Sequence, residues 1–118
     1  MIQHPPVPRD AHGQAIDLHP IAGLLDRIAA AWHPKAVWLF GSRAKGEAKP
    51  SSDWDLLVVL PDSEPAVDDP LAGWMMRKQS GVRADVILCG ASEFEDARDT
   101  PNTLAYEASH YGVAIRGH

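Results

Sequence analysis

Residues 38–60 read WLFGSRAKGEAKPSSDWDLLVVL, and this stretch decides how the chain folds. Two apolar runs, 36–40 and 54–60, the second interrupted by Asp55, end at Gly41 and at Pro61. Short apolar runs that are bounded by glycine, serine or proline are typical of buried strands. The segment between them, 41–52, is rich in glycine, serine and charge, which predicts a loop with room for one helical turn.

Two aspartates stand at the start of the second strand. Asp53 and Asp55 are two residues apart, so their side chains face the same side, about 6–7 Å apart along the backbone. Trp54 between them points to the other face, into the core. Two like charges that are buried side by side lose hydration, and a divalent cation removes that cost. Bridging carboxylates of this kind can hold two metal ions about 3.5–4 Å apart.

A third acid, Asp85, interrupts another apolar segment, 82–89, which predicts a third strand. If the second and third strands are neighbours, Asp85 can converge on the first two acids. Three carboxylates without a nearby histidine or cysteine ligand indicate Mg²⁺ or Mn²⁺ rather than Zn²⁺. Each feature alone is more often a turn or a solvated strand edge. Their combination on apolar strands favours a metal site.

The turn after the first strand has features that suit phosphate. Gly41 can adopt backbone angles that other residues avoid, which lets amides approach a ligand closely. Ser42 adds a hydroxyl and can cap a following helical turn whose amino end favours anions. Arg43 and Lys45 bring positive charge to the same place. A metal-bound triphosphate fits this pairing of acids on one strand with phosphate donors on another.

A competing phosphate motif is excluded. The glycines at positions 41 and 46 have the spacing of a P-loop and follow a strand. That motif then requires a lysine and a serine or threonine, which contact phosphate and Mg²⁺. Glu47 and Ala48 stand in those places.

The rest of the chain predicts helices around these strands. Residues 1–16 carry three prolines and read as an extended arm, and residues 17–118 as a single domain. A helix begins near Asp17 or His19 and stops at Pro34, and it carries one apolar stripe of Ile21, Leu24, Leu25, Ile28 and Trp32. The acidic segment 61–70 is a solvated connection to a helix over 71–79.

Beyond the third strand, Ser92 or Asp99 could cap short helices, the last over about 102–111, followed by an edge strand at 113–115. The predicted fold class is α/β (α+β), a small mixed β-sheet flanked by helices. The four tryptophans, Met75 and Met76 are read as core or interface residues rather than as a nucleobase platform, with core filling favoured for the methionines.

Composition limits the possible functions. The 118 residues form one domain, and the net charge of −5 argues against nonspecific binding along nucleic acid. No apolar run approaches the roughly 18 residues that cross a bilayer, and the amino terminus does not resemble a signal peptide. The single cysteine, Cys89, follows a strand, so we expect it to be buried and inert. A cytoplasmic location is therefore expected.

The combined motif resembles that of the DNA polymerase beta-like nucleotidyltransferase superfamily. It is similar in particular to the minimal nucleotidyltransferase (MNT) proteins that are often paired with HEPN-domain toxins. Gly41-Ser42, ten intervening residues, Asp53-Trp-Asp55 and Asp85 match the superfamily pattern, over a similarity that runs from about residue 16 to 116. The departure is Trp54, where the family usually has an aliphatic residue.

The resemblance implies a nucleotidyltransferase fold and a role for each motif residue. Asp53 and Asp55 would bind two Mg²⁺ ions, while Asp85 would bind one of them and help activate the attacking hydroxyl. Gly41 and Ser42 would hold the distal phosphates of the nucleotide, assisted by Arg43. The implied reaction transfers a nucleoside monophosphate, AMP from ATP as the family-based expectation, and releases pyrophosphate.

The resemblance also implies a partner. The chain has no additional domain for an acceptor, so a hydroxyl on a separate folded protein is expected as the target, and the subgroup implies a HEPN toxin in a hetero-oligomer. The chain would then be an antitoxin that acts by adenylylation. Two alternatives stay open: a non-catalytic antitoxin that neutralises its partner by binding, and an aminoglycoside-type nucleotidyltransferase whose acceptor pocket another subunit completes.

Overall fold

The apolar segments form one mixed sheet in a computed structural model, which describes residues 7–117. The strands are β1 (Ala36–Phe40), β2 (Trp54–Leu60), β3 (Ala84–Gly90) and β4 (Val113–Gly117), in the order β3-β2-β1-β4. β2 and β3 run parallel, whereas β1 is antiparallel to both β2 and β4. The predicted mixed sheet and the edge strand after the last helix are confirmed.

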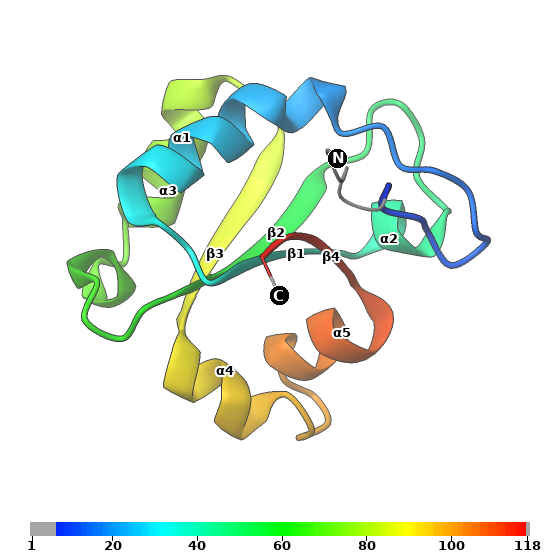
Figure 1. Ribbon diagram of the computed structural model, residues 1–118. Coiled ribbons are helices and arrows are strands. Elements are labelled where there is room, and N and C mark those ends of the chain that lie inside the picture. Colours follow the sequence, from blue (N-terminus) through cyan, green and yellow to red (C-terminus); the bar gives the residue numbers. More distant parts are fainter. Residues whose placement is uncertain (1–6, 118) are drawn as a thin grey trace, which may run out of the picture.

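Helices cover both faces of this sheet, as Figure 1 shows. A short 3-10 helix (η1, His19–Ile21), α1 (Ala22–Trp32) and α3 (Ala72–Ser80) lie on one face, and α4 (Ala91–Ala97) and α5 (Leu104–Tyr111) lie on the other. The short α2 (Ser42–Lys45) directly follows β1, and a 3-10 turn (η2, Pro65–Asp68) lies in the acidic connection. The predicted helices at both ends of the chain are therefore present.

The core is divided between the two faces because side chains alternate along each strand. The even-numbered residues of β2, with Leu56 as an example, pack with Ile21, Leu24 and Ile28 beneath α1. The odd-numbered residues of β2 pack with Phe94 of α4 and with residues of α5. Trp54 belongs to the first group and is buried, as predicted. Burial on both faces explains why the 54–60 run is apolar at every position except Asp55.

The helix caps confirm one prediction and correct another. Asp17 accepts a hydrogen bond from the backbone N–H of His19, at the predicted helix start. The last helix begins instead with Thr103, whose hydroxyl accepts from the Tyr106 N–H. Ser92 lies in the first turn of α4 and donates to Asp62, and Asp99 pairs with His110. Several serines, threonines and acids stand close together here, and their sequence spacing did not identify the one that caps.

The exposed side of α3 contradicts the core filling favoured for Met75, and of the two roles predicted for Trp74, core or interface, it excludes the core. Trp74 is 49% exposed and Met75 is 42% exposed, whereas Met76 is buried. Gly73 decides this orientation, because a Cβ there would lie 2.1 Å from the carbonyl oxygen of Val86. The helix therefore approaches β3 through Gly73 and Met76, and its periodicity turns Trp74 and Met75 to the outside.

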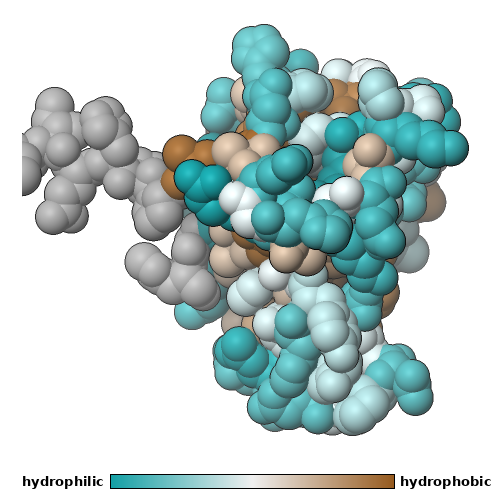
Figure 2. Space-filling model, turned by 90° about the vertical axis from the view of Figure 1, so that its right-hand side faces the viewer, coloured by the Kyte–Doolittle hydropathy of each residue, from teal (hydrophilic) through white to brown (hydrophobic). Residues whose placement is uncertain are grey.

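The described part of the predicted arm, residues 7–16, folds back on itself beside α2. Arg9 and Ala15 form an isolated bridge, and the backbone N–H of Ala11 donates to the Ala44 carbonyl at 2.9 Å. Ile16 packs against the core. Figure 2 shows the side of the molecule that carries α2 and this turn, and hydrophilic residues cover most of it. Residues 1–6 of the predicted arm lie outside the described residues.

None of the helices within residues 7–117 has the length and apolar character needed to cross a membrane.

Candidate active site

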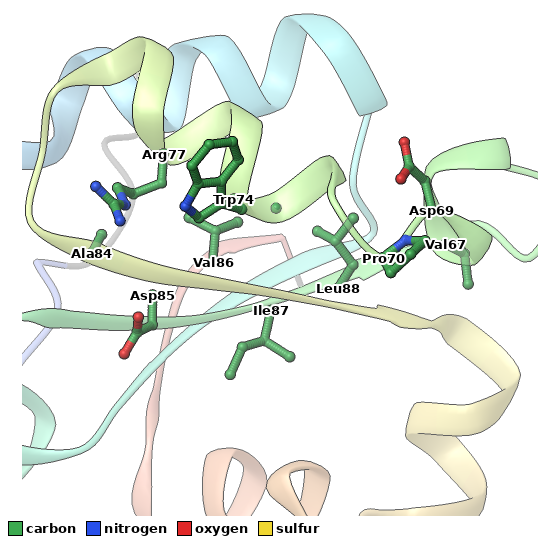
Figure 3. A pocket seen from close by; sticks show the side chains of 11 residues that line it. Val67, Asp69, Pro70, Trp74, Arg77, Ala84, Asp85, Val86, Ile87 and Leu88 are labelled. Atoms are coloured by element: carbon green, nitrogen blue, oxygen red, sulfur yellow. The ribbon is translucent and has the colours of Figure 1, made fainter.

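The register of the parallel strands brings two of the predicted acids together. Asp55 of β2 is the direct partner of Asp85 of β3. Both are odd-numbered positions, so their side chains lie on the face that α4 and α5 cover further along the strands. Figure 3 shows the Asp85 carboxylate pointing away from α3. The condition stated for convergence, that these two strands are neighbours, is met.

Electrostatics at this pair are those of a crowded anionic site. Burial raises the pKa of the Asp55 carboxyl, and the negative charges of Asp85 and then Asp53 raise it further. The Asp55 and Asp85 side chains are also close enough to share a hydrogen bond. The charges of Asp85 and Asp53 therefore make ionisation of Asp55 less favourable, and a bound cation would relieve this repulsion.

Asp53 lies at the outer end of the group and has a different partner. Its carboxylate is 3.4 Å from the Arg83 guanidinium, in a pair whose side chains are 52% and 76% exposed. Within residues 7–117, no three His, Cys, Asp or Glu side chains are grouped closely enough to hold a metal as they stand. The structure thus pairs Asp55 with Asp85, and it leaves Asp53 beside them in an exposed ion pair that contributes little to stability.

Gly41 joins the predicted phosphate turn to these acids. Its φ of 75° lies in the region that favours glycine, and a Cβ at this position would lie 2.2 Å from Oδ2 of Asp55. Phe40, the residue before it, pairs with Asp55 across β1 and β2. The turn therefore starts directly against the carboxylate, and Ser42 opens α2 one residue later. Sequence reasoning expected a close backbone approach here, although to a ligand rather than to Asp55.

Arg43 is engaged on the opposite side of β2. Its guanidinium donates to the carbonyls of Ser52, at 2.6 Å, and Pro50, at 3.2 Å, and it stacks 4.1 Å from the centre of the Trp54 ring. Trp54 faces the α1 side of the sheet, away from Asp55. In this arrangement Arg43 fastens the loop that leads into Asp53. Its contact with phosphate stays a prediction.

Lys45, the second cation of α2 beside Arg43, forms an ion pair with α5. Its ammonium lies 3.5 Å from Glu107 of α5, and both side chains are partly exposed. Sequence reasoning noted Lys45 as positive charge near the turn but missed Glu107, because nothing in the local pattern of the last helix indicates a contact with a segment 62 residues earlier.

A hollow between α3 and β3 is separate from the acids. Its volume is about 470 Å³, and it lies between α3 and the edge of β3, beside Trp74 and Arg77. Figure 3 shows that Asp85 and Ile87 leave β3 on the far side from this groove. The Asp85 backbone contributes to its floor, but the carboxylate faces away from it.

Comparison with known proteins adds a family and a fold. The model of the nucleotidyltransferase domain family matches residues 21–107, which include all six predicted site residues. Among curated proteins, no significant match was found. A solved structure of a proposed nucleotidyltransferase from Sulfolobus solfataricus is 22% identical, with a TM-score of 0.51 over 70% of this chain and 74% of that one.

A second solved structure is that of a toxin–antitoxin with AMP-PNP. It is 23% identical, with a TM-score of 0.55, and the match covers 81% of this chain and 73% of that one. At these identities the two structures show that the fold is shared.

Proposed function

Because the chain belongs to the nucleotidyltransferase domain family, we propose that it transfers AMP from ATP to a hydroxyl group on a partner protein and releases pyrophosphate. The observation that carries this proposal is the pairing of Asp55 with Asp85, together with the position of Asp55 directly against Gly41. That arrangement places an anionic pair beside the turn to which we assign the phosphates.

The donor set suits a divalent cation of the Mg²⁺ type. Asp53, Asp55 and Asp85 offer only carboxylate oxygens, which hard cations prefer. Burial and then the negative charges of Asp85 and Asp53 raise the pKa of Asp55, which supports a role for a cation at this place. Bound Mg²⁺ would supply charge neutralisation at the phosphates and acidify a coordinated hydroxyl. Asp53 can join the other two acids by turning away from Arg83, which costs little because that ion pair is exposed.

The remaining roles follow from position. Gly41 leaves room for the Asp55 carboxylate, and Ser42 and Lys45 lie beyond it on α2, where we place the distal phosphates. The acceptor oxygen bonds to the α-phosphorus while the bond from that phosphorus to the pyrophosphate oxygen breaks. The acceptor proton passes to the Asp85 carboxylate. Catalysis of this kind depends chiefly on positioning and on charge neutralisation.

For the biological acceptor we propose a HEPN-type toxin, which would make the chain an antitoxin. The likeness to a toxin–antitoxin structure with AMP-PNP supports this assignment, together with the motif resemblance described above. Within residues 7–117, the single sheet and its helices offer little surface to enclose a separate acceptor molecule. A folded partner can bring its own hydroxyl into the site instead.

The deciding experiment mixes the chain with a HEPN-type toxin, labelled ATP and Mg²⁺, and follows the mass of the toxin. We expect the toxin to gain AMP with the wild-type chain and with Glu95→Gln, an exposed control on α4, and to stay unmodified with Asp55→Asn or with EDTA. Neutralisation of an unmodified toxin that survives Asp53→Asn combined with Asp85→Asn would instead establish a non-catalytic antitoxin.

A further inference from the structure

We propose that two copies of this chain pair through α3 in an antiparallel arrangement, around a twofold axis. The inference goes beyond the proposed function and does not depend on it. It rests on an exposed apolar stripe on α3, on the groove beside this stripe and on the opposite charges at the two ends of the groove.

The stripe consists of three large apolar side chains on the outer side of α3. Leu71, Trp74 and Met75 are exposed, Leu71 most of all at 60%. Their spacing of three and four residues places them on one face of the helix. Half of the six large apolar residues that are exposed within residues 7–117 lie on this stripe. An apolar cluster of this kind marks a surface that contacts another protein.

The groove beside the stripe can receive a large apolar side chain from a partner. It holds about 470 Å³ between α3 and β3, and Val67, Val86 and Leu88 contribute apolar lining. Trp74 forms part of its wall and stands beside Val86, as Figure 3 shows. A tryptophan that a second copy places here removes roughly 150–250 Å² of its surface from water. Buried aromatic anchors supply much of the binding energy of protein interfaces.

The charges along the groove favour a second copy of the chain as the partner. Asp69 lies at one end of the groove and Arg77 at the other, with Trp74 between them (Figure 3). Each of the two charged residues is four positions from Gly73 in the sequence. Two antiparallel copies of α3 that cross at the level of Gly73 therefore bring Asp69 opposite the partner's Arg77, and the twofold axis repeats this pair. Within residues 7–117, neither of these side chains forms an ion pair.

Symmetry explains why a second copy fits better than a different protein. The chain itself carries both charges, whereas another protein needs a matching pair of its own. Asp68 and Lys78, the neighbours of Asp69 and Arg77, carry the same signs and extend the match. The Asp85 carboxylate points away from α3, as Figure 3 shows, so the pairing leaves the acids of both copies open.

The test is sedimentation equilibrium of the full chain, without nucleotide or toxin, from about 1 to 500 µM, which covers micromolar affinities. We expect a monomer–dimer equilibrium with a micromolar Kd, because one helix and one groove make a small interface. Trp74→Ala should weaken dimerisation at least about tenfold, since it removes the central aromatic anchor. Glu95→Arg, a charge reversal at an exposed position on α4, is the control and should leave the equilibrium unchanged.

A second pair of variants tests the antiparallel alignment. Asp69→Arg and Arg77→Asp each place like charges opposite one another twice, so each variant alone should dimerise at least about tenfold more weakly. An equal mixture of the two should restore the dimer, because every pair again joins an acid to a base. This rescue also excludes misfolding as the cause of the loss, although Asp69 accepts a hydrogen bond from the Leu71 N–H at the start of α3.

Three results would overturn the proposal. They are a wild-type chain that stays monomeric at the highest concentration, dimers that withstand all three single changes, and a mixture of the two charge variants that fails to pair. If the wild-type chain is monomeric and Trp74→Ala abolishes toxin binding, the stripe is instead the docking surface of the toxin.

Discussion

At the scale of single residues, Asp55 is the carboxyl group whose pKa is raised by burial and by its two acidic neighbours. Asp55 is partly buried, faces Asp85 across the strand pair and has Asp53 two residues before it. Its raised pKa means that the folded chain binds this proton more tightly than the unfolded chain does. The protonated carboxyl therefore favours folding at low pH, and this contribution is lost as the pH rises through the folded-state pKa.

The first prediction concerns Asp55→Asn. Without metal, the variant should be more stable than the wild type near pH 7, and the difference should shrink as the pH falls toward the ordinary aspartate value of 3.8. The reason is that the amide removes a like charge which the wild type carries only when ionised. Thermal denaturation in EDTA from pH 4 to 8 measures it. A stability difference that does not change with pH would contradict the raised pKa.

The second prediction concerns Gly41→Ala. The new Cβ would meet Oδ2 of Asp55, so we expect a loss of stability greater than the roughly 1 kcal/mol that positive φ alone costs. Transfer activity should fall at least about a hundredfold because the carboxylate is displaced from its place in the site. Gly81→Ala is the control, since Gly81 has a φ of 72° with nothing within 4 Å of its added Cβ. Chemical denaturation compares the stabilities of the two variants. Equal losses of stability would mean that backbone strain at positive φ accounts for the whole effect.

At the scale of elements, the loop between β1 and β2 is held by one side chain. Arg43 lies in α2, yet its guanidinium reaches the carbonyls of the 49–52 segment and the ring of Trp54. The loop therefore enters β2 along a fixed path, and Asp53 is the residue at which it arrives. Trp54 also gains a reason for its presence, because its ring is the surface on which Arg43 stacks.

The third prediction separates this clamp from a phosphate contact. If Arg43 acts through the loop, Arg43→Lys should weaken Mn²⁺ binding nearly as much as Arg43→Ala does. The reason is that one ammonium cannot replace a planar guanidinium that donates to several carbonyls and stacks on a ring. Both variants should weaken Mn²⁺ binding without nucleotide, measured by calorimetry, and change tripolyphosphate binding little. Lysine rescue of tripolyphosphate binding would return Arg43 to the phosphate role predicted from the sequence.

The elements differ in how far the sequence predicts them. Strands 36–40 and 54–60 match to the residue, because glycine and proline end each apolar run. The outward turn of Trp74 and Met75 could not be predicted, since it depends on the close contact of Gly73 with β3. The pairing of Asp55 with Asp85 was predictable once the strands were taken as neighbours. The partners of Arg43 were not predictable, because they depend on the path of a loop that has no periodic pattern.

At the scale of the whole molecule, the two faces of the sheet carry different groups of residues. One face packs against η1, α1 and α3 through the larger apolar cluster. The other carries the acid pair at one end and α4 and α5 at the other. The segment that joins β2 to β3 crosses the first face by way of α3, as Figure 1 shows. The β2–β3 connection thereby stays clear of the face on which we propose that the nucleotide binds.

The fourth prediction is that Mg²⁺ and ATP together stabilise the folded chain. At a free concentration of about 100 times the Kd, the gain should be about 2.7 kcal/mol, provided that the unfolded chain does not bind. Either component alone should give less, since the metal links the acids to the phosphates. Thermal shift measurements test this, with the Asp55→Asn variant expected to respond weakly. An equal response of that variant would place the nucleotide elsewhere.

The parallel register of β2 and β3 also limits which changes in chain length the protein can tolerate. One residue added or deleted inside either strand would move Asp85 to the opposite face from Asp55, because side chains alternate. Insertions in the 61–70 connection leave that alignment untouched. Length variation among natural relatives should therefore accumulate in this connection and avoid the strands, even at positions far from the acids themselves.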